Sequence, residues 1–337
     1  MLEKLFSKYF QLNDLIIAIH SNSLTWLDNS SDYLTLGPVS PLTANLELTL
    51  LELSPETADL VIPLPSQNHK TANYQLLLDS PISVTLYQDT NQIWSELEGI
   101  GRTWKDYDSK KGIGIRYKGV DLNRVYINLL YASGLITKLL VKEKYYKIHA
   151  SGAVVDGKGI VFIGNSGKGK STTALALLEN GHSVLSDETV LLYQKDHVYS
   201  AHSITDVIKT QKATIHRFFP KLENQPAYQE VGDELYYKIG LMSDFRYQRQ
   251  ANIHSVMILN QTGEKESSIE KISPSKVVSD FLPATLEPFE PSAVVTNKFS
   301  FLMQFLNAMD CYCVHFGTDM KFFVTTIEKW AGEVSKK

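Results

Sequence analysis

The eight residues Gly164–Ser171 are the part of this sequence whose residue types and spacing most directly suggest chemistry. They read GNSGKGKS, a full match to the phosphate-binding pattern G-x-x-x-x-G-K-[ST]. Glycines let consecutive backbone N–H groups turn toward phosphate oxygens, and the start of the next helix adds a partial positive charge. The pattern therefore predicts a loop that holds the phosphates of a nucleoside triphosphate. The expected binding residues are Gly164, Asn165, Ser166, Gly167, Lys168, Gly169, Lys170, Ser171 and Thr172.

Two side chains of this loop have expected roles of their own. Lys170 is expected to bridge the β- and γ-phosphates of ATP, and the Ser171 hydroxyl to ligate Mg²⁺. The alternative is a chance octet in a solvated turn, and the flanking residues argue against it. Apolar residues 160–163 predict a strand that enters the loop, and residues 172–179 predict a helix that ends at a glycine, Gly181.

A pair of carboxylates follows the loop at Asp187 and Glu188, after a short apolar strand at residues 184–186. Only one short helix separates this strand from the loop, so the two acids are expected beside the γ-phosphate. Phosphoryl transfer needs an acid that holds Mg²⁺ and a base that accepts the hydroxyl proton. An ordinary polar turn is the alternative. Because no later apolar strand ends in Asp, this pair is predicted to supply both roles.

The elements that must position these residues fall into two predicted domains. Residues 1–121 contain several alternating apolar runs separated by prolines, which predicts a β-rich N-terminal domain. Residues 123–142 predict an amphipathic helix that opens a P-loop domain over residues 122–337, with one apolar face formed by Val125, Leu129, Ala132, Ile136 and Leu139. Two apolar runs around Asp156-Gly157 predict a hairpin, so the strand that enters the loop should be antiparallel to its predecessor. We therefore expect an α/β protein with a mixed sheet.

The later segments carry weaker signals. Several basic residues could reach phosphate oxygens, although solvated surface charges are the commoner outcome: Lys209, Lys212, His216, Arg217, Arg246 and Arg249. Cys311 and Cys313 would share one face of a strand, and two ligands are too few for a structural zinc site. A closing helix is expected to turn four side chains toward the core, namely Phe322, Phe323, Ile327 and Trp330.

Composition limits the class of protein. The 337 residues are 43% hydrophobic and 21% charged with a net charge of −4, which gives no basis for bulk electrostatic binding to nucleic acid or membrane. Polar residues interrupt the N-terminal apolar run, so no signal peptide is expected, and no segment is expected to reach the length of a membrane span. The sequence predicts a cytoplasmic protein that binds neither nucleic acid nor membrane. Its composition is compatible with a homo-oligomer.

From about His149 to Tyr193 the chain resembles the catalytic domain of bacterial HPr kinase/phosphorylases and the wider group of HPr-kinase-like hydroxyl kinases. The residues that carry this resemblance are IHASG, the hairpin VVDGKGIVFIG, the loop GNSGKGKS and the stretch NGHSVLSDET. The resemblance implies a fold shared with phosphoenolpyruvate carboxykinases and Mg-ATP-dependent transfer to a serine-type hydroxyl. It also implies that Asp187 is the base, that Glu188 is a neighbouring acid that assists the metal, and that His149 lies near the phosphates.

The sequence also departs from HPr kinases. Their later metal-binding glutamate, and the stretch tied to phosphorylase action, have no recognisable counterpart in residues 200–211. We therefore expect a small molecule or a peptide that bears a hydroxyl as the acceptor. The alternatives are an HPr-type protein serine kinase/phosphorylase and a non-catalytic ATP-binding regulatory subunit.

Overall fold

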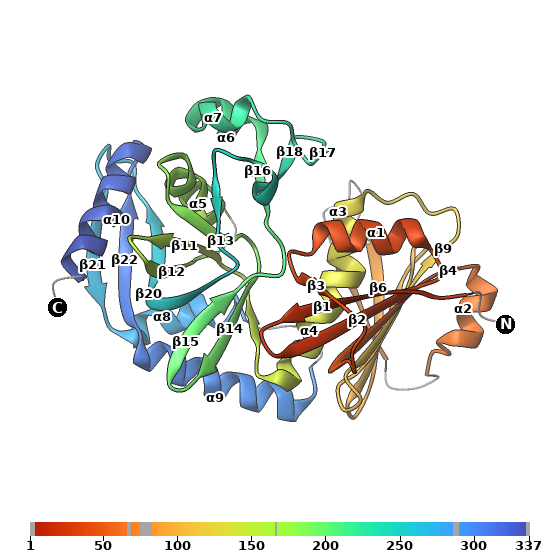
Figure 1. The fold of residues 1–337 in the computed structure, drawn as a ribbon. Coiled ribbons are helices and arrows are strands. Elements are labelled where there is room, and N and C mark those ends of the chain that lie inside the picture. Colours follow the sequence, from red (N-terminus) through yellow and green to blue (C-terminus); the bar gives the residue numbers. More distant parts are fainter. Residues whose placement is uncertain (1–3, 66–68, 75–81, 166, 286–289, 335–337) are drawn as a thin grey trace. The chain divides into compact units, whose positions relative to one another are not determined.

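The computed structural model describes residues 4–65, 69–74, 82–165, 167–285 and 290–334 (Figure 1). Ser166, one of the predicted phosphate-binding residues, lies outside the described residues. The chain forms two compact units, Met1–Tyr145 with Glu287–Thr296 and Tyr146–Leu286 with Asn297–Lys337. This division differs from the predicted boundary at residues 121 and 122, because the helical segment that follows the boundary packs on the N-terminal sheet.

The first unit contains a nine-stranded sheet in the order β3-β1-β2-β4-β9-β8-β7-β6-β5. Strand β4 is parallel to β2 and β9, and the other pairs are antiparallel. Helix α1 (Leu24–Tyr33) and helix α2 (Pro55–Val61) begin at serine caps, Ser23 and Ser54. The strands are β1 (Phe6–Leu12), β2 (Leu15–Ser21), β3 (Gly37–Val39), β4 (Leu46–Leu53), β5 (His69–Tyr74), β6 (Ile82–Asp89), β7 (Gln92–Leu97), β8 (Gly101–Asp106) and β9 (Lys111–Tyr117).

One helical segment, Arg124–Glu143, packs on this sheet and explains the shifted boundary. It comprises α3 (Arg124–Ile127), a π-helical turn (Asn128–Ala132), α4 (Ser133–Leu139) and a 3-10 turn (Leu140–Glu143). The π-turn adds a residue and rotates the buried face, so Tyr131 is fully buried where Leu129 was expected. Its ring meets Trp26 edge to face at 5.2 Å, and Gly114 leaves the room it needs, since a Cβ there would lie 2.7 Å from it.

The same segment corrects the expectation about membrane spans. It is 20 residues long and apolar enough, by length and composition, to cross a membrane. However, 72% of its apolar stretch is buried inside the structure, as is usual for the core helix of a globular unit.

The second unit is built on a ten-stranded mixed sheet. Its path is β10-β14-β15-β20-β12-β11-β13-β19, and β22 pairs with β20 and with β21. The strands are β10 (Tyr146–Ile148), β11 (Ser151–Val155), β12 (Lys158–Ile163), β13 (Ser183–Ser186), β14 (Val190–Lys195), β15 (Val198–His202), β19 (Arg246–Tyr247), β20 (Gln250–Gln261), β21 (Ser268–Ile272) and β22 (Asp310–Phe316). The predicted hairpin is present, because β11 pairs antiparallel with β12 around Asp156 and Gly157, both at positive φ. On its other side β12 runs parallel to β20, so the predicted α/β class with a mixed sheet is confirmed.

Helices cover this sheet, and a small second sheet projects from the unit. The helices are α5 (Lys170–Glu179), α6 (Lys212–Phe218), α7 (Pro220–Glu223), α8 (Pro274–Phe281), α10 (Met320–Val334) and the part of α9 (Ser292–Ala308) that follows Thr296. The small sheet has the order β16-β18-β17, from β16 (Val207–Gln211), β17 (Gln229–Val231) and β18 (Glu234–Lys238) (Figure 1).

The core of the second unit lies between the large sheet, α5 and α10. Alternate residues of β12, Ile160 and Phe162, pack in one cluster with α5 and with Phe323 and Ile327 of α10. Trp330 joins this cluster, as predicted. Phe322 does not, because its position on α10 leaves it 38% exposed, and the prediction that it faces the core is wrong.

Candidate active site

The glycine loop joins β12 to α5, as the sequence predicts. Gly167 and Gly169 have φ values of +79° and +89°, a conformation that side chains disfavour. At Gly169 a side chain would also meet Phe316, whose ring carbon Cζ would lie 2.5 Å from its Cβ. Helix α5 begins with no hydrogen-bonded cap from any side chain that the structure describes. Its first backbone N–H groups are therefore suited to an anion.

Lys170 lies in the first turn of α5, and its side chain folds back along the loop. Its Nζ donates to the carbonyl oxygens of Gly164 at 2.7 Å and Asn165 at 3.4 Å, and the residue is 7% exposed. Burial lowers the pKa of Lys170, whereas the charges of Asp187 and Glu188 raise it. Lys170 still lines the cavity described below, but it is held by the loop instead of extending freely into open space.

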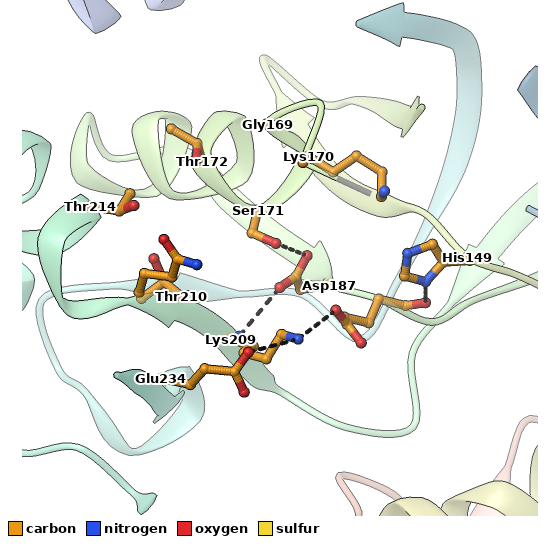
Figure 2. A pocket seen from close by; sticks show the side chains of 13 residues that line it. His149, Gly169, Lys170, Ser171, Thr172, Asp187, Lys209, Thr210, Thr214 and Glu234 are labelled. Carbon is orange, nitrogen blue, oxygen red and sulfur yellow. Dashed lines mark hydrogen bonds and ion pairs between the residues drawn. The ribbon is translucent and has the colours of Figure 1, made fainter. Parts of the chain in front are cut away.

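Asp187 directly follows β13 and contacts two different elements (Figure 2). The Ser171 hydroxyl donates to its Oδ1 at 3.0 Å, and the backbone N–H of Lys209 points at its Oδ2 across 3.3 Å. Asp187 is 3% exposed. Burial, followed by the negative charge of Glu188, raises the pKa of this carboxyl to about 7. A carboxyl with a pKa near neutrality is well placed to accept a proton.

Glu188 follows Asp187 at a sharp turn of the backbone. It has a φ of +64°, and the N–H of Thr189 donates to the carbonyl of Asp187 at 2.7 Å. Its own carbonyl accepts a hydrogen bond from Nδ1 of His149 at 3.0 Å, which fixes the imidazole tautomer. Burial lowers the pKa of His149, opposed by the charge of Glu188, so this ring favours its neutral form.

The small sheet supplies the opposite side of the site through Lys209 of β16 and Glu234 of β18. The Lys209 Nζ lies 3.5 Å from Oε1 of Glu188 and 3.4 Å from Oε1 of Glu234. Burial acts to lower the pKa of Lys209, but these two carboxylates raise it overall. Lys209 was predicted among several basic residues, most of them expected on the surface, and also, like Arg217 or Arg246, as a residue that could line the pocket of an acceptor with a carboxylate. Glu234 was not predicted at all.

These residues enclose an open cavity of about 360 Å³ (Figure 2). It is lined by His149, Gly167, Gly169, Lys170, Ser171, Thr172, Asp187, Glu188, Lys209, Thr210, Gln211, Thr214 and Glu234. The three basic residues Arg217, Arg246 and Arg249 are exposed and are not part of this lining. Gly164, Asn165 and Lys168 belong to the loop but do not line the cavity.

The lining brings together the predicted catalytic and metal residues: His149, Lys170, Ser171, Asp187 and Glu188. Within the described ranges, no group of three or more His, Cys, Asp or Glu side chains is arranged to hold a metal ion by itself. The oxygen atoms suited to Mg²⁺ are instead those of Ser171 and of the two acids.

Comparisons with known proteins find relatives over part of the chain. An HPr kinase/phosphorylase of Lactobacillus delbrueckii subsp. bulgaricus is 39% identical over 69 residues, which is 20% of this chain and 22% of that protein. One from Lactobacillus johnsonii is 41% identical over 68 residues, 20% of this chain and 21% of that protein. One from Prosthecochloris aestuarii is 39% identical over 67 residues, 19% of this chain and 20% of that protein. The chain thus spans about a fifth of the length of these relatives.

Among solved structures, the HPr(Ser) kinase/phosphatase from Coxiella burnetii aligns with 56% of this chain and 97% of its own, at 13% identity and a TM-score of 0.33. No family model matches the sequence. The identities of about 40% over the shared stretch confirm the predicted resemblance to HPr kinase/phosphorylases.

Proposed function

We propose that this protein is an ATP-dependent kinase that transfers the γ-phosphoryl group to a serine-type hydroxyl. The observation that carries the proposal is the position of Asp187. It accepts a hydrogen bond from the Ser171 hydroxyl of the glycine loop and faces the N–H of Lys209 across the cavity. A base between a phosphate-binding loop and an open polar wall is the arrangement that hydroxyl phosphorylation requires. The relatives named kinase/phosphorylase support the same reaction class.

The residues of the loop fit Mg-ATP. The positive-φ glycines and the uncapped start of α5 are suited to presenting backbone N–H donors to phosphate oxygens. Ser171 and Asp187 place two oxygen ligands 3.0 Å apart, and Glu188 adds a carboxylate at the cavity, so Ser171 with an acid of this pair would hold Mg²⁺. When bound, the metal ion would neutralise phosphate charge and orient the γ-phosphoryl group.

The protein side chains then divide the work of the transfer. The Lys170 ammonium stabilises negative charge on the phosphoryl oxygens, together with the loop amides. Asp187 accepts the proton of the attacking hydroxyl, since burial brings its pKa to about 7, where the carboxylate is both available and basic. His149 remains neutral beside the two acids and contributes hydrogen bonding near the phosphates.

The roles outside the cavity are part of the same proposal. The first unit is assigned to acceptor recognition or an accessory task, because all the proposed nucleotide-binding residues lie in the second unit. We also propose that the enzyme works in the cytoplasm. A second candidate function, phosphorylation of a serine in the protein HPr, is favoured by the names of the relatives.

The test incubates the purified protein and Mg-ATP with HPr, with serine and serine-ending peptides, and with sugars, followed by mass spectrometry of each acceptor. Addition of one phosphoryl group to a small molecule or peptide supports the proposal. Addition to HPr alone selects the second candidate. Nucleotide binding without any transfer would instead indicate a regulatory subunit.

A further inference from the structure

The cavity of the second unit has two walls of different origin (Figure 2). One wall is the glycine loop and the start of α5. The other, which we call the acceptor wall, consists of Lys209, Thr210, Gln211, Thr214 and Glu234 from β16, α6 and β18. Asp187 lies between them, in contact with Ser171 on one side and facing the Lys209 N–H on the other. Phosphoryl transfer places the attacking and leaving oxygens in line, so the acceptor is expected on the wall opposite the loop.

Every side chain of the acceptor wall is polar, and its two ionised groups have opposite charge. Lys209 and Glu234 are paired at 3.4 Å, longer than the roughly 2.7–2.9 Å of a charge-assisted hydrogen bond. Their side chains are 22% and 30% exposed, so a ligand can reach both. A ligand with only a carboxylate would be repelled by Glu234 and Glu188, and one with only an ammonium group would be repelled by Lys209. A ligand with both groups satisfies the wall without leaving a charge unpaired.

We infer that the acceptor wall is a subsite for a small hydroxyl compound that carries both a carboxylate and an ammonium group. Lys209 binds the carboxylate, and Glu234 binds the ammonium group. A cavity of about 360 Å³ is near the lower end of the roughly 300–1,000 Å³ typical of small-molecule sites, which favours a compact acceptor. This inference rests on the proposed kinase function, and it specifies the acceptor that the same cavity takes.

The implied reaction is balanced. The bond between the γ-phosphorus and the bridging oxygen of ATP breaks, and ADP leaves. A bond forms between that phosphorus and the acceptor hydroxyl oxygen, and the hydroxyl proton passes to Asp187.

Three related acceptors test the two charges separately in the presence of Mg-ATP. L-serine carries both groups, N-acetyl-L-serine only the carboxylate, and L-serinamide only the ammonium group. Wild-type protein should show the highest kcat/KM with L-serine. Lys209→Gln should raise the KM for L-serine about tenfold or more and remove the preference over L-serinamide, whereas Glu234→Gln should remove the preference over N-acetyl-L-serine. The KM for ATP should change little in both variants.

Matched variants control for general damage. Lys212→Gln removes a lysine that is paired with Glu230 outside the cavity lining and should retain the wild-type acceptor preference. Lys209→Arg keeps the positive charge and should retain most of the discrimination, which separates loss of charge from loss of folding. Melting temperatures of all variants identify any that are unfolded.

Binding provides a readout that does not depend on turnover. L-serine binding to wild-type protein is measured by saturation-transfer NMR, with and without Mg²⁺ and a non-hydrolysable ATP analogue. Serine binding that is lost in Lys209→Gln, with no transfer in any assay, would uphold the subsite and refute the kinase function. Transfer to L-serine that is unaffected by both substitutions would refute the subsite and leave the kinase function intact. Transfer to HPr alone would also overturn this inference.

Discussion

The two walls of the cavity differ in how the chain builds them. The loop wall is one continuous stretch, in which a strand, a glycine turn and a helix follow each other in order. The acceptor wall combines β16, α6 and β18, and Glu234 reaches Lys209 only because β18 pairs antiparallel with β16. The loop wall is suited to a ligand part that is common to many enzymes, the phosphates. The acceptor wall carries a lysine and a glutamate that a ligand can reach, so substrate choice is expected to reside there.

The largest effect is expected for Asp187→Asn, because Asp187 contacts the glycine loop on one side and faces the acceptor wall on the other. The amide keeps the size of the side chain but cannot accept the hydroxyl proton, so kcat should fall about 10²–10⁴-fold while nucleotide binding persists. Steady-state kinetics and ATP titration measure the two effects. A loss below about tenfold would mean that Asp187 is structural or only assists the metal. A larger loss in Glu188→Gln would reverse the assignment of the two acids.

Lys170→Ala tests the loop wall alone. The stabilisation of the protein by Mg-ATP, which reaches about 2.7 kcal/mol at a ligand concentration of 100 Kd, should mostly vanish together with turnover. Without nucleotide the melting temperature should fall slightly, because the carbonyl oxygens of Gly164 and Asn165 lose their lysine donor. Thermal shifts with and without Mg-ATP measure both effects. Equal ATP-induced shifts in wild type and variant would contradict the nucleotide-binding assignment.

The pH dependence of the reaction rate tests whether Asp187 is the base. Because the carboxyl has a pKa of about 7 in the ligand-free protein, kcat/KM should fall about tenfold for each pH unit well below 7 and level off above it. The sign for stability is opposite to that of an ordinary ion-paired acid. Between the usual Asp pKa of about 3.9 and about 7, the folded state holds more protons than the unfolded state, so the contribution of Asp187 to stability declines as pH rises.

Asp187→Asn cannot ionise and therefore should gain melting temperature relative to wild type at pH 8 more than at pH 5. Melting curves at the two pH values measure the difference. An equal difference at both pH values would mean that the pKa of Asp187 is not raised.

The smallest effect compares two glycines of the loop. Gly167→Ala and Gly169→Ala both place a side chain at positive φ, which costs about 1–2 kcal/mol. Only Gly169→Ala also meets the Phe316 ring, whereas Gly167 has no atom within 4 Å of the added Cβ. Gly169→Ala should therefore be the less stable variant in chemical denaturation. Equal stability would show that Phe316 moves aside at little cost.

The sequence predicts the loop wall well because local rules determine it. The octet, the hairpin at Asp156-Gly157 and the end of α5 at Gly181 all depend on residues close together in the chain. Lys170 lies at the cavity as predicted, but nothing in the sequence reveals that the carbonyl oxygens of Gly164 and Asn165 hold its ammonium group, and its role toward phosphate stays a prediction. The acid pair was located from its position after the loop and one short helix, whereas His149 was located through family resemblance, and the structure brings all three to one cavity.

The acceptor wall and the unit boundary could not be predicted in the same way. Glu234 and Lys209 are 25 positions apart, and only the pairing of two short strands makes them neighbours. The helical segment 124–143 was predicted to belong to the second unit but lies in the first. Its apolar face could pack on the sheet that precedes it or on the sheet that follows it in the sequence. The π-turn buries Tyr131 instead of Leu129, and the Tyr131 ring packs against Trp26. The spacing of apolar residues along a helix cannot predict this contact, because Trp26 is distant in the sequence.

The left-handed backbone at Glu188 has a consequence for how this protein could evolve. Glycine adopts that conformation without the penalty that a longer residue incurs, so a search for stability alone would place glycine at position 188. Such a change would delete the carboxylate that faces Lys209. Stability of the fold and the side chain that contacts Lys209 therefore place opposite demands on position 188, and a glycine introduced there to stabilise the fold would remove an acid of the candidate active site.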